Sequence, residues 1–149
     1  MKREAGMTKV ELVVVIAVTG IIVVLLGTAI YQIITVSEYG NGRLTAWHEL
    51  QNAAYWFNFD GQRAVTASVS GGLSLTLSDN SSITYSLVGT ELRRTTGGSQ
   101  MTLARNIASA AFAINSRLVT MSLTSSPEGW DSVSENGTYR AYLRPSEGG

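Results

Sequence analysis

Residues 6–26 read GMTKVELVVVIAVTGIIVVLL, and this stretch determines how the rest of the chain must be organised. A basic leader containing Lys2 and Arg3 precedes it, and one carboxylate, Glu11, lies at the start of a long apolar run. No further charge occurs until Glu38. A carboxylate so close to an apolar helix is costly in lipid unless it has a partner, so Glu11 is the first candidate for a functional residue.

The uncharged run from Leu12 to Ser37 is long enough to cross a membrane as a helix. Its roughly 26 residues correspond to about 39 Å of helix, against a hydrocarbon core of about 30 Å. Helix is the expected form, although valine and isoleucine dominate the run, because a backbone in lipid must satisfy its own hydrogen bonds. Lys2, Arg3 and Lys9 precede the run, so the positive-inside rule predicts a cytoplasmic amino terminus and an exported remainder.

Three interpretations of this segment compete. The first is an ordinary single-pass anchor with Glu11 at the membrane interface. The second is a cleaved secretory signal, with the small residues 27–29 as the cut site. The third is a leader cut off after Gly6, which leaves the apolar helix on the mature protein. The pattern of residues alone favours the first two.

Residues 6–21 resemble the prepilin-type cleavage and methylation motif of type IV pilins and type II secretion pseudopilins. The resemblance implies that a membrane peptidase cuts after Gly6 and that the new amino terminus, Met7, is methylated. It also implies that Glu11 pairs with the terminal amine of a neighbouring subunit as helices bundle into a filament, and it matches Gly20 to a frequent helix glycine. The expected partners are the prepilin peptidase/methyltransferase, other pilin or pseudopilin subunits and the inner membrane.

The match has departures from the family pattern. Met7 lies where phenylalanine is usual, Lys9 lies where an apolar residue is usual, and Gly27 replaces the mid-helix proline of many major pilins. Lys9 offers Glu11 a pairing within its own chain, and the missing proline favours a minor subunit. Gly20 and Gly27 lie seven residues apart on one helix face, so both are candidates for close helix packing.

Composition fits one anchored domain. The formal net charge is zero, so no nucleic-acid partner is predicted, and there is no cysteine for a disulfide or a thiolate metal site. The expected organisation is a leader over residues 1–6, a transmembrane and filament-core helix over 7–37, an amphipathic helix extension over 38–61 and a β-rich head over 62–149.

The helix extension is expected to pack on the head. Residues 39–42, which contain two glycines, predict a kink or a loop, and Asp60 with Gly61 predicts the end of the helix. Apolar residues recur at helical spacing and are expected to form the buried face: Leu44, Trp47, Leu50, Ala54 and Phe57.

Beyond Val65 the apolar period changes to two, which predicts six or seven short antiparallel strands with one polar face. The apolar positions of these strands fall within residues 73–77, 83–87, 91–94, 101–103, 112–114, 119–124 and 139–144. The predicted fold class is therefore α+β, with a long helix packed on an antiparallel sheet. Residues 82–87, 91–94 and 139–144 also resemble the heads of minor pseudopilins and minor pilins of the J type.

The head shows no catalytic constellation, and no cofactor or metal is expected. His48 is the only histidine and is expected at the surface. The arginines in two pairs are expected to face solvent: Arg93 with Arg94, and Arg140 with Arg144.

Two further head features have alternatives. The loop over residues 127–137 groups three carboxylates with Trp130 and is expected to be a solvated connection, with calcium binding as the alternative. Asn80 and Asn136 begin glycosylation sequons, which are frequent by chance.

The predicted function is that of a structural subunit, with the head outside and the chain a substrate of processing rather than an enzyme. The alternative is a single-pass membrane-anchored binding protein that forms no filament. The residues do not distinguish adhesion, twitching, DNA uptake and protein secretion, nor a major from a minor subunit.

Overall fold

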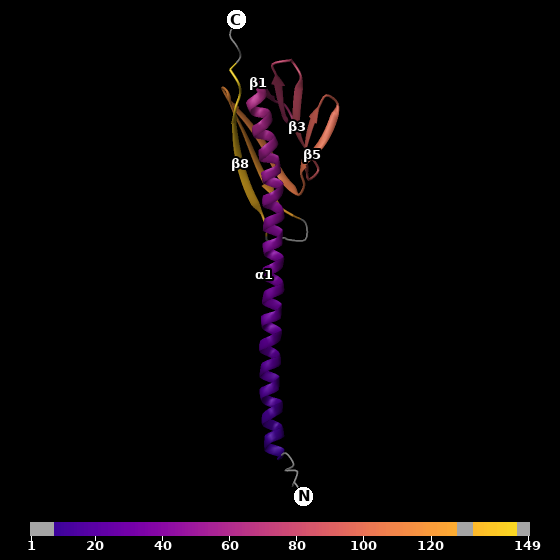
Figure 1. Cartoon of the computed structure of the whole chain (residues 1–149), viewed down its shortest axis with the longest axis vertical. Helices are drawn as coiled ribbons and strands as arrows, with labels where there is room; N and C mark the ends of the chain where they lie inside the picture. The colour runs from indigo at the N-terminus through magenta and orange to yellow at the C-terminus, as the bar shows by residue number, and fades with distance from the viewer. Residues whose placement is uncertain (1–7, 128–132, 146–149) are drawn as a thin grey trace. The chain divides into compact units, whose positions relative to one another are not determined.

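A computed structural model describes residues 8–127 and 133–145, without the side chains of residues 37–39. In this part of the chain one helix is followed by eight strands (Figure 1). The chain divides into two compact units, residues 1–38 and residues 39–149, and each is described by itself. The predicted α+β fold is confirmed.

The helix α1 spans Lys9–Arg63, and Thr8 caps its first turn. The Glu11 N–H donates to Thr8 Oγ1 at 3.3 Å, as expected for a threonine N-cap. The loop that was one alternative for residues 39–42 is absent, because these residues are helical. The predicted stop at Asp60 and Gly61 is also early, since the helix continues to Arg63. A glycine inside a helix costs only about 1 kcal/mol relative to alanine, less than the packing of nearby core side chains contributes.

Within the first unit, every described side chain from residue 9 to residue 36 is exposed. This part of α1 is apolar and long enough to span a membrane. None of the described residues of the unit buries these side chains, so its apolar surface has no partner there.

Two antiparallel sheets make up most of the second unit (Figure 1). Five strands form the first sheet in chain order: β1 (Ala64–Val69), β2 (Leu73–Leu77), β3 (Ser82–Val88), β4 (Glu91–Thr96) and β5 (Ser99–Ala104). Three strands form the second sheet, also in chain order: β6 (Ile107–Asn115), β7 (Leu118–Ser125) and β8 (Glu135–Tyr142).

The period-two segments predicted seven of these strands and missed β1. The predicted hairpin between β2 and β3 is confirmed, with Leu75 opposite Ile83. The inward alternation predicted for the last two strands is also confirmed, because Val119 and Ala141 are buried partners. Only the first residue of β1, Ala64, is buried, so this strand carries little hydrophobic periodicity.

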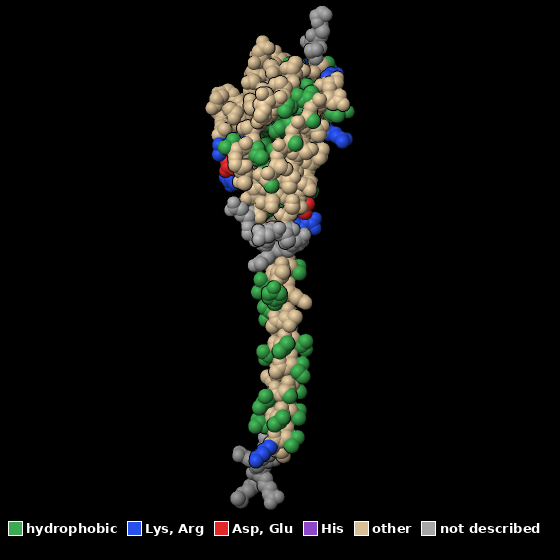
Figure 2. Space-filling view, turned by 180° about the vertical axis from the view of Figure 1, so that it is seen from behind, with side chains coloured by type: hydrophobic (Ala, Val, Ile, Leu, Met, Phe, Trp, Pro, Cys, Tyr) green, Lys and Arg blue, Asp and Glu red, His purple; other side chains and the backbone are tan. Residues whose placement is uncertain are grey.

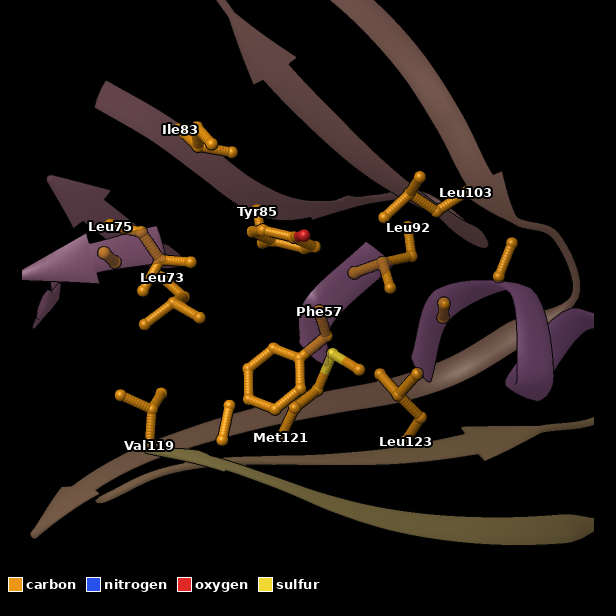
Figure 3. Close-up of a cluster of buried hydrophobic side chains, with 14 of the residues drawn as sticks. Phe57, Leu73, Leu75, Ile83, Tyr85, Leu92, Leu103, Val119, Met121 and Leu123 are labelled. Carbon is orange, nitrogen blue, oxygen red and sulfur yellow. The ribbon is translucent and has the colours of Figure 1, made fainter. Parts of the chain in front are cut away.

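The core lies between the two sheets and one face of α1. Figure 3 shows Phe57 of the helix between Tyr85 of the first sheet and Met121 of the second. The Phe57 and Tyr85 rings meet edge to face, with centroids 6.3 Å apart. Burying a side chain of this size stabilises the fold by about 1.5–3 kcal/mol.

The buried face of the helix differs from the predicted one. Leu50, Ala54 and Phe57 are buried as expected, but Leu44 is 59% exposed and Trp47 is 58% exposed. The full buried face of this part of α1 is uncharged except near its end and consists of Gly42, Ala46, Leu50, Ala53, Ala54, Phe57, Asp60 and Gly61.

A glycine allows the end of α1 to approach β8 closely. A Cβ atom added to Gly61 would lie 2.5 Å from the Cβ of Ala141, which is closer than real Cβ atoms come. Gly61 was predicted to stop the helix, but in the structure it provides space for the neighbouring strand.

Side chains of α1 also bind the backbone at β5. Asn52 Nδ2 donates to the Leu103 carbonyl at 2.5 Å, and a Glu49 carboxylate oxygen accepts from the Arg105 N–H at 2.8 Å. At the other end of the unit, the Arg144 N–H donates to the Ala64 carbonyl at 2.8 Å. These bonds connect the helix, the five-stranded sheet and the last strand into one structure.

Candidate functional site

The first candidate site is the start of α1. Glu11 lies in the first turn, with its side chain exposed. No ion pair within the described residues involves Glu11, so the self-pairing with Lys9 considered from the sequence is absent there. A carboxylate in the first turn is stabilised by the positive end of the helix dipole. The sequence Thr8 to Glu11 also has the spacing of a capping box, and the hydrogen bond observed there runs from the Glu11 backbone N–H to the Thr8 hydroxyl.

The two helix glycines also lie on open surface. A Cβ atom added to Gly20 or to Gly27 would have no non-local atom within 4 Å. Neither glycine therefore packs against another part of the chain that the structure describes, and a packing role would involve a second molecule. Gly6 and Met7, the predicted cleavage and methylation residues, lie outside the described residues, as do Trp130 and the centre of its loop.

The second candidate site is a buried charged cluster in the head, which the sequence reading missed. Asp60, at the end of the buried helix face, is 0% exposed, and Arg94 on β4 is 8% exposed. Arg94 donates to both carboxylate oxygens of Asp60, with Nε–Oδ2 2.6 Å and Nη2–Oδ1 2.9 Å. The Tyr85 hydroxyl donates to the same Oδ2 at 2.5 Å.

The environment of this cluster shifts the pKa values of two of its members. Burial raises the pKa of Tyr85 well above its usual value, and the hydrogen bond to Asp60 raises it further. The hydrogen bonds to Asp60 also raise the pKa of Arg94. The Arg94 guanidinium lies 5.0 Å from the centre of the Trp56 ring, a cation–π distance. All three polar groups are paired, so the cluster links α1 to β3 and β4 and offers no free acid or base.

The prediction that Arg94 faces solvent is wrong. Leu92 and Arg94 lie on the same face of β4, and both are buried. The alternation therefore indicated an inward position, which is tolerated because Asp60 provides a bidentate partner. Arg93, which was also expected to face solvent, is partly exposed, and its guanidinium lies 2.9 Å from the Glu91 carboxylate.

The other candidate residues of the head lie at the surface. His48 is exposed, as predicted, and so are Arg140 and Arg144. Asn80, the first residue of one sequon, lies in the turn between β2 and β3 with φ of 63°. Among the residues that the structure describes, no three histidine, aspartate or glutamate side chains are grouped to hold a metal ion.

A scan against protein-family models found no match, and searches of curated proteins and of solved structures found none either. The resemblance of residues 6–21 to the prepilin motif accordingly rests on the motif residues.

Proposed function

We propose that this chain is a structural subunit of a type IV pilus or a type II secretion pseudopilus. It would be cut after Gly6, methylated on Met7 and assembled through its apolar helix and Glu11. It would enter the inner membrane with its amino terminus in the cytoplasm and its head outside. The chain would be a substrate of the processing peptidase, not an enzyme.

The observation that carries the proposal is the unpartnered apolar part of α1. Every side chain from residue 9 to residue 36 is exposed, and a carboxylate lies in the first turn. In lipid, an unpaired carboxylate costs about 2.5–3.5 kcal/mol on insertion scales. Pairing of Glu11 with the amine of Met7 in a neighbouring subunit would remove that cost, so bundling of helices would be favoured over separate helices in the membrane.

The competing proposal is a membrane-anchored binding protein with the same topology and no filament. It shares the apolar helix and the exported head, and it treats Glu11 as a helix cap at the membrane surface. The spacing of Thr8 and Glu11 is the observation behind this candidate, because in a capping box the glutamate side chain bonds the N-cap backbone and needs no second subunit.

The mature amino terminus distinguishes the interpretations. The chain is produced together with a prepilin peptidase, purified from membranes and analysed by mass spectrometry of its amino-terminal peptide. N-methylated Met7 is the expected first residue. A start at Met1 would support the plain anchor, and a start at Ile30 would support a secretory signal.

Two substitutions separate charge pairing from helix capping. Glu11→Gln keeps a capping side chain but removes the charge, so filament yield is expected to fall by about tenfold or more while membrane insertion persists. Thr8→Ala removes the cap at a cost of about 1 kcal/mol and keeps the carboxylate, so assembly is expected to continue. Equal filament yields from wild type and Glu11→Gln would contradict the pairing role.

A further inference from the structure

The three-stranded sheet has a face that the proposed assembly does not use. This outer face, opposite the core, carries mostly short polar and small side chains, with three larger ones at one end and no carboxylate. Its members are Ser109, Ala111, Ala113 and Asn115 on β6; Leu118, Thr120, Ser122 and Thr124 on β7; and Asn136, Thr138, Arg140 and Tyr142 on β8. Hydroxyl and amide groups of neighbouring strands meet across it, with Thr124 Oγ1 2.8 Å from Asn136 Oδ1.

Three arginines gather at one corner of this outer face. Arg140 and Arg144 are exposed on either side of Tyr142, which is 69% exposed. In the hairpin between β6 and β7, Arg117 is fixed beside them, because its Nε and Nη2 both donate to the Leu143 carbonyl, at 3.2 and 2.5 Å. Among the described residues, none of these three arginines has a carboxylate partner.

The other arginines of the head are arranged differently: four pair with carboxylates, and Arg63 lies over the Phe59 ring, 5.1 Å from its centre. Arg43, Arg93, Arg94 and Arg105 each have a carboxylate within 4 Å. Figure 2 shows basic side chains beside acidic ones on parts of the head and basic side chains without an acidic neighbour at another edge. The corner therefore carries positive charge that the described part of the chain does not neutralise.

The chemistry of the outer face fits an acidic polysaccharide. Guanidinium groups bind carboxylates through paired hydrogen bonds, and an exposed tyrosine offers a flat apolar face beside a polar hydroxyl. The neutral hydroxyl and amide groups beyond the corner match a ligand with many hydroxyls and few charges. A nucleic acid would need a longer basic stripe, and this chain has a net charge of zero.

A second copy of the chain is a poorer occupant. Within the described part of the head, each carboxylate already accepts a hydrogen bond: Glu49, Asp60, Asp79, Glu91 and Glu135. We propose that the outer face binds an acidic polysaccharide, with a uronate carboxylate at Arg140 and Arg144 and a sugar ring against Tyr142. This inference goes beyond filament assembly and does not depend on it.

The test uses the full chain in detergent and isothermal titration calorimetry with a galacturonate tetrasaccharide. A neutral galactose tetrasaccharide and a short single-stranded oligothymidine serve as comparison ligands. The expected result is binding of the uronate alone, weakened when salt rises from about 50 to about 500 mM, because exposed charges are screened. Equal binding of the neutral sugar, preference for oligothymidine, or no uronate binding at millimolar concentration would overturn the proposal.

Variants then locate the site. The double change Arg140→Gln with Arg144→Gln is expected to weaken uronate binding about tenfold or more, and Tyr142→Ser to weaken it by a similar factor. Arg63→Gln, which alters an exposed arginine on α1, is the matched control and should keep wild-type affinity. Circular dichroism establishes that each variant is folded. Unchanged affinity in the double variant would overturn the assignment, as would self-association that only this variant abolishes, which would identify a second copy as the occupant.

Discussion

The two parts of α1 have the same secondary structure and different surroundings. From residue 9 to residue 36 no side chain is buried, whereas between residues 40 and 63 one face of the helix lies in the core of the head. In proteins, a helix gains most of its stability from the packing of one face against the rest of the fold. The second part therefore packs within this chain, whereas the first part has no packing partner among the residues that the structure describes.

The largest expected effect comes from removing the first part. A chain that begins at residue 37 is expected to lose membrane association entirely and to keep a cooperative unfolding transition, since the core residues all lie beyond that point. Membrane flotation and thermal circular dichroism measure the two properties. A head that fails to fold without the apolar segment would contradict the statement that the second part of α1 is stabilised by packing within this chain.

Removing the buried carboxylate tests what holds the second part. Asp60→Ala leaves the Arg94 guanidinium buried without its partner, so the free energy of unfolding is expected to fall by about 3–5 kcal/mol. Arg93→Ala is the matched control on the same strand, and the surface pair that it removes is worth about 0–1 kcal/mol. Urea denaturation of both variants measures the loss in the free energy of unfolding. Equal losses would show that the buried pair contributes no more to stability than the surface pair.

The tyrosine of the same cluster predicts a dependence on pH. Tyr85 has a raised pKa when folded, so its contribution is fully present below the unfolded value of about 10 and is lost as pH rises above it, because only the unfolded state then releases the proton. Tyr85→Phe is expected to cost about 1–3 kcal/mol at neutral pH and to reduce the decline above pH 10.

Urea denaturation between pH 7 and 11 measures this decline. Tyr142→Phe, at an exposed tyrosine, should follow the wild-type curve. An unchanged decline in Tyr85→Phe would mean that other groups cause the loss of stability at high pH.

The smallest effect is expected at the exposed face of the same helix. Trp47→Ser is predicted to change the free energy of unfolding by less than about 0.5 kcal/mol, because the side chain is more than half exposed. The Phe57 side chain is smaller than that of Trp47 but fully buried. Phe57→Ala should therefore lower the free energy of unfolding by about 3–5 kcal/mol. Comparable losses for the two would mean that Trp47 packs in the core after all.

Periodicity predicted the fold class and seven of the eight strands because apolar residues alternate with polar or small ones in those strands. It did not select the buried face of α1, since Leu44 and Trp47 are as apolar as the residues that pack. The position of Arg94 in phase with Leu92 did indicate burial, but its charge argued against it. Its partner, Asp60, lies 34 residues away in sequence, and only the folded chain brings the two together.

The hydrogen bond that Asn52 donates and the one that Glu49 accepts both affect the edge of the five-stranded sheet. β5 is the last strand of its sheet, and an uncovered last strand offers its free amides and carbonyls to strands of other molecules. Here helix side chains occupy the Leu103 carbonyl and the Arg105 amide. An added strand would therefore find two of the backbone groups at this edge already bonded within the head.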